Sequence, residues 1–168
     1  VPVTGVDHLH RLLTADRIGK EAAIRLRPFG AHVVGISRTA APSDLADEIA
    51  SASQLDAILP RADIVMLATP LTEETRRLFD APRIARMKKG VVLINIARGS
   101  VVNESALIEA LQNGTIRGAG LDVFDHEPHV PAALMDLPGV VLLPHVASGT
   151  HDTRQAMADL TVHNLRAH

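Results

Sequence analysis

The sequence predicts a doubly wound α/β domain, in which helices cover both faces of a parallel β-sheet. Short apolar runs such as Val91–Ile94 alternate with longer segments of helical periodicity, and strands that are apolar on both faces are typical of parallel sheets. The 168 residues, 46% of them hydrophobic, are enough for one substantial core. We therefore expect a single domain over residues 1–168.

The first part of the chain is expected to form two strands joined by a helix. Leu9–Leu13 predicts the first strand, and Arg17–Phe29 carries apolar residues at helical spacing. That helix should stop at Gly30, because glycine commonly ends helices. The apolar run His32–Ile36 predicts the second strand, and a further helix is expected near Ser53–Leu59.

The middle of the chain repeats the alternation. The apolar run Ile64–Ala68 predicts a strand that ends in a turn around Pro70. A short helix is expected near Pro82–Met87. Val91–Ile96 is the clearest buried strand, since only Asn95 interrupts its apolar character.

The last part should complete the sheet. Asn103 can cap a helix that runs to about Gln112, and Gly114 should end it. Ala119–Val123 and Val140–Leu143 predict the last strands, and Thr150–His168 a long closing helix.

Composition excludes several classes of function. The 17 Lys and Arg against 19 Asp and Glu leave no cationic surplus for nucleic acid or an acidic membrane, so we expect neither partner. The absence of cysteine excludes disulfides, thiol nucleophiles and thiolate metal sites, and it suits the cytoplasm. The apolar runs are too short to span a bilayer, and no G-x-S-x-G nucleophile elbow occurs.

Ligands of doubly wound sheets bind beyond the carboxyl ends of the strands. After the first strand, dinucleotide-binding folds carry G-x-G-x-x-G, whereas this chain has Thr14-Ala15-Asp16-Arg17-Ile18-Gly19 and keeps only the third glycine. Taken alone, this segment is better explained as a plain turn capped by Thr14 or Asp16.

The segment Ser37-Arg38-Thr39 follows the second strand, where NAD-binding folds place a carboxylate for the ribose. No carboxylate is present, and Arg38 offers a guanidinium to a 2′-phosphate. This pattern favours NADP, with NAD as the second choice. A solvated strand end explains it equally well.

Four motifs follow the later strands in one order. They are Ala68-Thr69-Pro70-Leu71-Thr72 with Thr75, Asn95-Ile96-Ala97-Arg98-Gly99, Gly120-Leu121-Asp122-Val123-Phe124 with Glu127-Pro128, and Leu143-Pro144-His145 with Ser148 and Thr150. Together they resemble the D-isomer-specific 2-hydroxyacid dehydrogenases, most closely the NADP-preferring glyoxylate and hydroxypyruvate reductases. The resemblance covers roughly Arg17 to the C-terminus. It implies a Rossmann-like coenzyme domain of an oxidoreductase that uses NADP to reduce a small 2-oxo acid.

The resemblance implies catalytic roles for Arg98, Glu127 and His145. Arg98 would bind the carboxylate and carbonyl oxygen of the substrate, for which a planar guanidinium is well suited. His145 would be the acid/base, because imidazole exchanges protons near neutrality. Glu127 would orient this histidine and stabilise its imidazolium form. Taken singly, each residue is also explained by a purely structural role, as a solvated surface charge or a hydrogen-bonded surface histidine.

The resemblance also implies contacts with the cofactor. Asp122 would face the nicotinamide carboxamide, and Thr69 and Pro70 would line the adenosine side. The expected cofactor-binding residues are Arg17, Ile18, Ser37, Arg38, Thr39, Thr69, Pro70, Thr75, Ile96, Ala97, Arg98, Asp122 and His145. No metal site is expected, because the prolines around His126 and His129 make that segment a loop without an evident third ligand.

Two departures from the family matter. Family members normally carry a second, substrate-binding domain, of which this chain has little or nothing. Thr4-Gly5-Val6-Asp7-His8 resembles a loop of that domain, either by accident or because intervening residues are missing. Asp16 would also stand near the pyrophosphate, and two charges about 4 Å apart repel by up to roughly 4 kcal/mol at an effective dielectric near 20.

Three interpretations therefore stay open. The leading one is the coenzyme domain of an NADP-dependent reductase. The others are a non-catalytic Rossmann module that serves association, as in the C-terminal binding protein co-repressors, and a truncated product without an evolved function. Intact Arg98, Glu127 and His145 favour the enzyme, whereas Asp16 and the missing domain favour the module. Because family members dimerise through this domain, we expect a homodimer.

Overall fold

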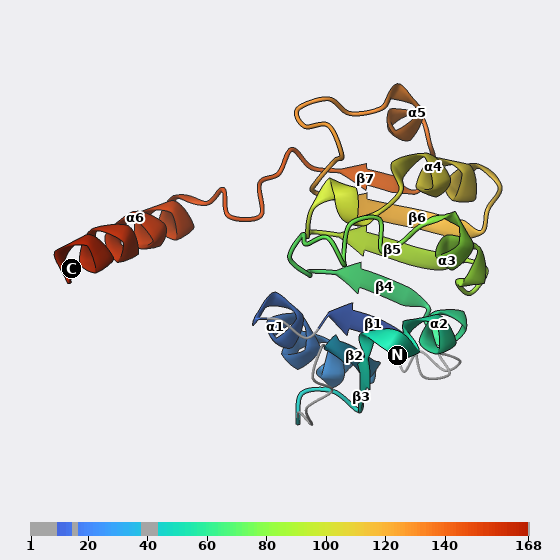
Figure 1. The fold of residues 1–168 in the computed structure, drawn as a ribbon, viewed down its shortest axis with the longest axis horizontal. Coiled ribbons are helices and arrows are strands. Elements are labelled where there is room, and N and C mark those ends of the chain that lie inside the picture. The colour runs from blue at the N-terminus through green and yellow to red at the C-terminus, as the bar shows by residue number, and fades with distance from the viewer. Residues whose placement is uncertain (1–9, 15–16, 38–43, 168) are drawn as a thin grey trace, which may run out of the picture.

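The described part of the chain forms a seven-stranded sheet in the order β3-β2-β1-β4-β5-β6-β7 (Figure 1). The computed structural model describes residues 10–14, 17–37 and 44–167. The strands are β1 (His10–Thr14), β2 (His32–Ser37), β3 (Glu48–Ser51), β4 (Ile64–Leu67), β5 (Val91–Asn95), β6 (Ile116–Leu121) and β7 (Val140–Leu142). Every neighbouring pair is parallel. The expected doubly wound parallel sheet is confirmed.

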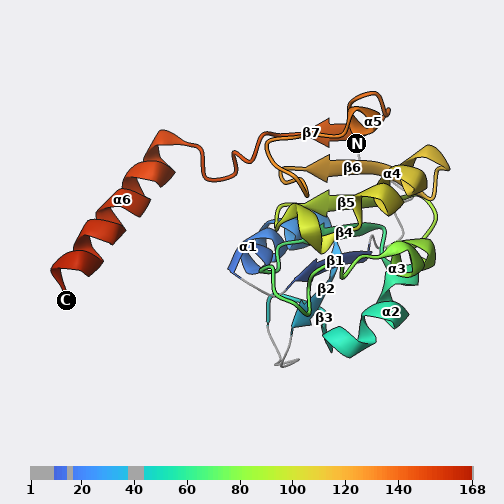
Figure 2. The same ribbon diagram turned by 45° about the horizontal axis from the view of Figure 1, so that its top comes forward.

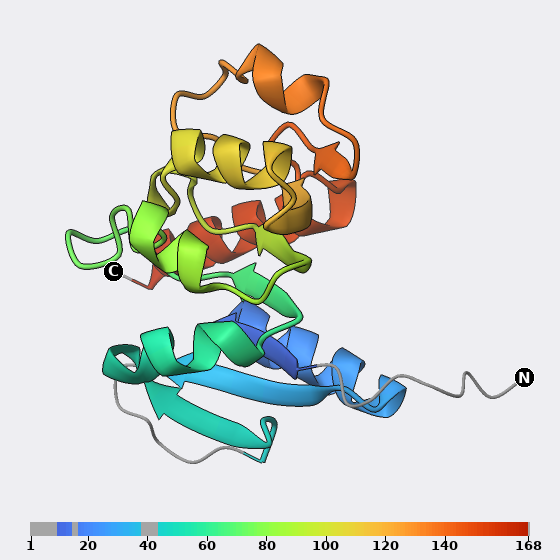
Figure 3. The same cartoon turned by 90° about the vertical axis from the view of Figure 1, so that its right-hand side faces the viewer.

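Helices lie on both faces of this sheet. They are α1 (Arg17–Leu26), α2 (Leu55–Ile58), α3 (Ala81–Arg86), α4 (Glu104–Gln112), α5 (Ala132–Met135) and α6 (His151–Arg166). Single 3-10 turns are η1 (Arg27–Phe29), η2 (Ala52–Gln54), η3 (Leu59–Arg61) and η4 (Gly99–Val101). Figure 3 shows α2, α3 and α4 on one face and α1 on the other. In the part of the chain that the structure describes, no helix is both long and apolar enough to cross a membrane.

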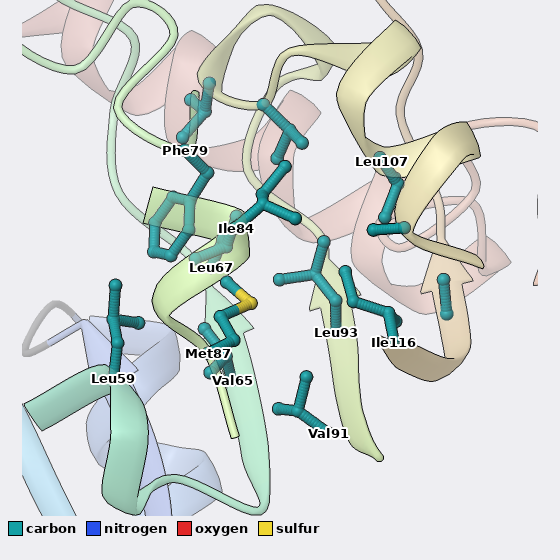
Figure 4. Close-up of a cluster of buried hydrophobic side chains, with 14 of the residues drawn as sticks. Leu59, Val65, Leu67, Phe79, Ile84, Met87, Val91, Leu93, Leu107 and Ile116 are labelled. Atoms are coloured by element: carbon teal, nitrogen blue, oxygen red, sulfur yellow. The ribbon is translucent and has the colours of Figure 1, made fainter. Parts of the chain in front are cut away.

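The main core lies between the sheet and α2, α3 and α4 (Figure 4). Val65 and Leu93, on neighbouring central strands, are fully buried and pack with Phe79, Ile84 and Leu107. A second, smaller cluster joins α1 to β2. This core holds the central strands in place, and the carboxyl ends of those strands carry the expected site.

Element boundaries differ from expectation where proline or a close backbone contact intervenes. The helix expected to continue to Phe29 leaves α geometry after Leu26, because Pro28 lacks the N–H that the next turn needs. Gly30 ends it with a φ of 72°, as expected. Strand β6 begins at Ile116, earlier than Ala119, because Ile116 and Gly118 already pair with β5. Gly118 also lies so close to Gly139 that a Cβ would fall 2.7 Å from the carbonyl oxygen of Gly139.

The closing helix forms but does not cover the sheet. Thr150 caps α6 by accepting a hydrogen bond from the N–H of Thr153 at 3.2 Å. The helix then extends away from the domain (Figures 1 and 2), and no residue of α6 is buried. Its larger apolar side chains, such as Leu160 at 60% and Leu165 at 74% exposure, have no cover within the described chain. The helical periodicity correctly predicted the helix, but not its packing.

Candidate active site

The expected site residues gather at the carboxyl edge of the sheet. Ser37 is the last residue of β2, and Asp122 directly follows β6. Because all the strands are parallel, these positions share one edge with Thr69 after β4, Arg98 after β5 and His145 after β7. The strand order reverses between β1 and β4, and doubly wound sheets bind ligands at such a point.

A hydrogen-bonded pair brings Glu127 and His145 together. The Nδ1–H of His145 donates to Oε2 of Glu127 at 2.8 Å, and the other oxygen, Oε1, accepts from the N–H of Phe124 at 3.0 Å. The His145 side chain is 44% exposed. Its Nε2 is thus the ring nitrogen through which it can exchange a proton with a ligand.

This arrangement lowers the pKa of Glu127 below its ordinary value of 4.5. The hydrogen bond from His145 is the main cause; the N–H of Phe124 and the charges of His145 and Arg98 act in the same direction, against partial burial. Glu127 is therefore an ionised carboxylate at neutral pH, which can orient the imidazole of His145 and stabilise its charged form.

The loop that carries Arg98 is organised by Asn95, a buried residue that is only 2% exposed. The Oδ1 of Asn95 accepts from the N–H of Ala97 at 3.0 Å, and its Nδ2 donates to the carbonyl of Arg98 at 3.1 Å. The guanidinium of Arg98 donates to the carbonyl of Ala97 at 2.6 Å. Asn95 is not among the expected site residues, although a lone amide in an apolar strand was a usable signal.

Asp122 holds the backbone that follows His145. It is 3% exposed, and its two oxygens accept from the N–H groups of Val146 at 2.9 Å and Ala147 at 3.1 Å. His145 itself has a φ of 54°, in the left-handed region that costs most residues energy. Asp122 thus helps to keep His145 in an uncommon backbone conformation, and its expected contact with nicotinamide stays a prediction.

The expected cofactor residues after β4 form a braced loop. The hydroxyl of Thr75 donates to the carbonyl of Pro70 at 2.7 Å and accepts from the N–H of Thr72 at 2.7 Å. The N–H of Ile96 donates to the carbonyl of Leu67 at 3.1 Å, which ties the Arg98 loop to the end of β4. These bonds bring the loops after β4 and β5 together.

The remaining expected residues are less informative. Arg17 opens α1, and Ile18 beside it is 51% exposed. Arg38 and Thr39, with Asp16 and Thr4-Gly5-Val6-Asp7-His8, lie outside the described residues.

The segment with His126 and His129 is a tight turn, as its prolines predict. The N–H of His129 donates to the carbonyl of His126 at 2.8 Å, and the two residues form an isolated antiparallel bridge. Over residues 10–14, 17–37 and 44–167, no group of three or more His, Cys, Asp or Glu side chains is placed to hold a metal ion.

Comparison with known proteins gives one family. Residues 12–147 match the family described as D-isomer specific 2-hydroxyacid dehydrogenase, NAD binding domain. The chain is 43% identical over 151 residues to glyoxylate reductase of Thermococcus kodakarensis, covering 90% of this chain and 45% of that protein. It is 45% identical over 168 residues to glyoxylate/hydroxypyruvate reductase B of Serratia proteamaculans, covering 97% and 52%.

Solved structures agree. The NADPH-dependent glyoxylate/hydroxypyruvate reductase of Sinorhizobium meliloti, in complex with NADP and malonate, superposes with a TM-score of 0.87 at 41% identity, covering 99% of this chain and 51% of that one. A D-isomer specific 2-hydroxyacid dehydrogenase of Xanthobacter autotrophicus, in complex with NADPH and MES, gives a TM-score of 0.76 at 39% identity, covering 83% and 44%. The chain thus spans about half the length of the relatives it matches.

Proposed function

Since this chain belongs to the D-isomer specific 2-hydroxyacid dehydrogenase family through its NAD binding domain, we propose that it is the coenzyme-binding half of an NADP-dependent reductase. Its substrate would be a small 2-oxo acid such as glyoxylate or hydroxypyruvate, which the names of its relatives support. The observation that carries the proposal is the hydrogen-bonded pair of His145 and Glu127 at the sheet edge that also holds Arg98.

The residues of this edge fit a dinucleotide. The reversal between β1 and β4 is where such sheets bind nucleotides, and α1 begins at Arg17, close after the end of β1. The N-terminus of that helix offers partial positive charge to a pyrophosphate. Ser37 ends β2 without a carboxylate that would repel a 2′-phosphate, and Arg38 follows it in sequence. The bound NADP and NADPH of two related structures support the same choice.

The chemistry divides among three side chains. NADPH, when bound, supplies a hydride to the carbonyl carbon of the 2-oxo acid. Arg98 would pair with the substrate carboxylate and polarise the neighbouring carbonyl. His145 would give the proton on Nε2 to the carbonyl oxygen, so that the oxo acid gains a hydride and a proton and becomes a hydroxy acid. Glu127 would stabilise the imidazolium before that transfer.

Reduction of glyoxylate and of hydroxypyruvate, followed by the loss of NADPH absorbance, tests this function. Replacing His145 with alanine removes the proton donor, so turnover should fall by about 100- to 10,000-fold. The substitution His163→Ala on the exposed face of α6 is a matched control that should leave turnover unchanged. Near-normal turnover in His145→Ala would refute the assignment.

A non-catalytic association module is the second candidate. It is favoured by Thr14-Ala15-Asp16, where two glycines of the phosphate-binding loop are absent. The double substitution Thr14→Gly, Asp16→Gly removes the charge and should strengthen NADPH binding by up to about two or three decades. If neither form binds NADPH, this candidate becomes the better account.

We infer a homodimer, which light scattering at micromolar concentration would contradict by giving the mass of one chain. The absence of cysteine from the sequence supports a reducing compartment such as the cytoplasm.

A further inference from the structure

Two loops of the site meet through their backbones. Gly99, directly after Arg98, lies so close to the loop after β6 that a Cβ on it would fall 1.9 Å from the carbonyl carbon of Phe124 and 2.3 Å from the nitrogen of Asp125. No side chain can occupy that space. The glycine is therefore required by the close approach of the two chains.

A side-chain hydrogen bond joins the same loops. The hydroxyl of Ser100, next to Gly99, donates to Oδ1 of Asp125. The carbonyl of Ser100 accepts from the N–H of Arg77 at 2.7 Å, so the serine is itself held from the loop after β4. The loop with Asp125 is thereby anchored to η4, the turn that follows Arg98.

The start of α4 supplies a second anchor for Asp125. The N–H of Asp125 donates to Oε1 of Glu104, the first residue of α4, at 3.4 Å. Burial raises the pKa of Glu104 above its ordinary 4.5; the charge of Asp125 adds to this, whereas the N–H of Asp125 and the charge of His126 oppose it. Two carboxylates thus lie near each other. The hydroxyl of Ser100 offers Asp125 a hydrogen bond that offsets their repulsion.

The link extends to the catalytic pair through a short segment. Phe124, adjacent to Asp125, donates its N–H to Oε1 of Glu127, whose Oε2 accepts from His145. The backbone donor that orients Glu127 is therefore one residue from the carboxylate that Ser100 holds. A shift of Asp125 would displace that donor.

We propose that Ser100 is a positioning residue: its hydroxyl and the carboxylate of Asp125 form a clamp that fixes the segment 124–127 against the Arg98 loop and so sets how Glu127 faces His145. Arg98 and His145 must act on neighbouring atoms of one small substrate, and misplacement by about 1 Å can cost up to about a hundredfold in rate. This catalytic meaning rests on the proposed function. The effect of Ser100 on the position of Glu127 is independent of that function.

The substitution Ser100→Ala tests the proposal, since it removes the hydroxyl without changing any charge. The titration of the Glu127 carboxyl carbon, followed by NMR in the chain without cofactor or substrate, is the readout. The pKa of Glu127 should rise toward its ordinary 4.5, because the hydrogen bond from His145 that chiefly lowers it loosens. Ser100→Gly removes the same hydroxyl and should act alike, whereas Ser100→Thr keeps it and should restore the original titration.

Ser51→Ala is the matched control. The hydroxyl of Ser51 is hydrogen-bonded to Ser53 and Gln54 at the end of β3. This strand forms the edge of the sheet opposite to β7, which precedes His145. A general loss of stability would affect both variants, but the clamp predicts that only Ser100→Ala moves the Glu127 titration. In the active enzyme the same variant should lower kcat by about 10- to 100-fold with little change in the KM for NADPH.

An unchanged Glu127 titration in both folded variants, Ser100→Ala and Ser100→Gly, would overturn the clamp, as would an equal shift in Ser51→Ala. Because the titration needs neither NADPH nor a 2-oxo acid, this failure is distinct from failure of the proposed function. Loss of turnover in His145→Ala with no shift in the Ser100 variants would leave the function standing and remove the clamp.

Discussion

Replacement of Asp122 with alanine should destabilise the loop that carries His145. The carboxylate is 3% exposed and accepts two backbone hydrogen bonds, from Val146 at 2.9 Å and Ala147 at 3.1 Å. Hydrogen bonds to charged groups each contribute about 1.5–3 kcal/mol, and the desolvation of a buried carboxylate offsets part of that gain. We expect a net loss of about 2–4 kcal/mol for Asp122→Ala. Asp122→Asn should lose only about half as much stability, because its one carbonyl oxygen can still accept a hydrogen bond.

Urea unfolding and amide hydrogen exchange measure this effect. With a denaturant slope of about 2 kcal/mol per molar, the unfolding midpoint of Asp122→Ala should fall by about 1–2 M. The N–H groups of Val146 and Ala147 should exchange about 30- to 1,000-fold faster, the equivalent of the same free energy. Asp136→Ala, at an exposed position, should stay within about 0.5 kcal/mol of the unmodified chain. An equally small effect of Asp122→Ala, with both amides still protected, would refute the reasoning.

Further substitutions test three other features of the molecule. The pKa of Glu127 is lowered on folding, so its pairing with His145 should stabilise the folded chain at pH values above the ordinary pKa of 4.5. This stabilisation should disappear as the pH falls through the lowered pKa. The urea midpoints of Glu127→Gln and of the unmodified chain should therefore differ at neutral pH and converge in acid. Gly99→Ala should lower thermal stability by more than the roughly 1–3 kcal/mol usual for overpacking, since its Cβ would meet backbone at 1.9 Å, whereas Gly120→Ala, whose Cβ would have its nearest neighbour at 3.9 Å, should be tolerated. Arg38→Ala should narrow the preference for NADPH over NADH in calorimetric titrations, and an unchanged ratio would remove Arg38 from the 2′-phosphate site.

The central strands could be predicted because burial dictates their composition. Val91–Asn95 is apolar except for one residue, and it lies in the middle of the sheet. Strand β3 (Glu48–Ser51) was not expected, because an edge strand is half exposed and its polar residues resemble a loop. The short helix α5 (Ala132–Met135) was missed because a single turn carries too few residues to show periodicity.

The site could be predicted only where a residue carries the chemistry itself. Arg98, Glu127 and His145 were expected from the motifs that resemble the family, because each taken singly is explained as well by a surface position; the structure brings Glu127 and His145 into contact. Ser100 and Asp125 did not stand out, because the sequence cannot show that η4 and the loop after β6 touch. Supporting residues of this kind depend on distances between loops that only the folded chain defines.

The position of α6 likewise could not be predicted from the sequence. Its helical pattern and its cap at Thr150 are local properties, which the residues encode. Whether its apolar side chains pack against the sheet depends on the course of residues 143–149, which carry the helix away from the domain (Figure 2). Periodicity predicts that a helix forms, and it does not predict which surface covers it.

Binding of NADPH at the carboxyl edge of this sheet, beside the pair of His145 and Glu127, is the central claim. Isothermal titration calorimetry of NADPH and NADH into the unmodified chain tests it most directly, because a protein without Trp or Tyr gives little intrinsic fluorescence. We predict saturable binding of NADPH and weaker binding of NADH. Tighter binding of NADH would contradict the choice of cofactor, and the absence of binding by either dinucleotide would contradict the central claim.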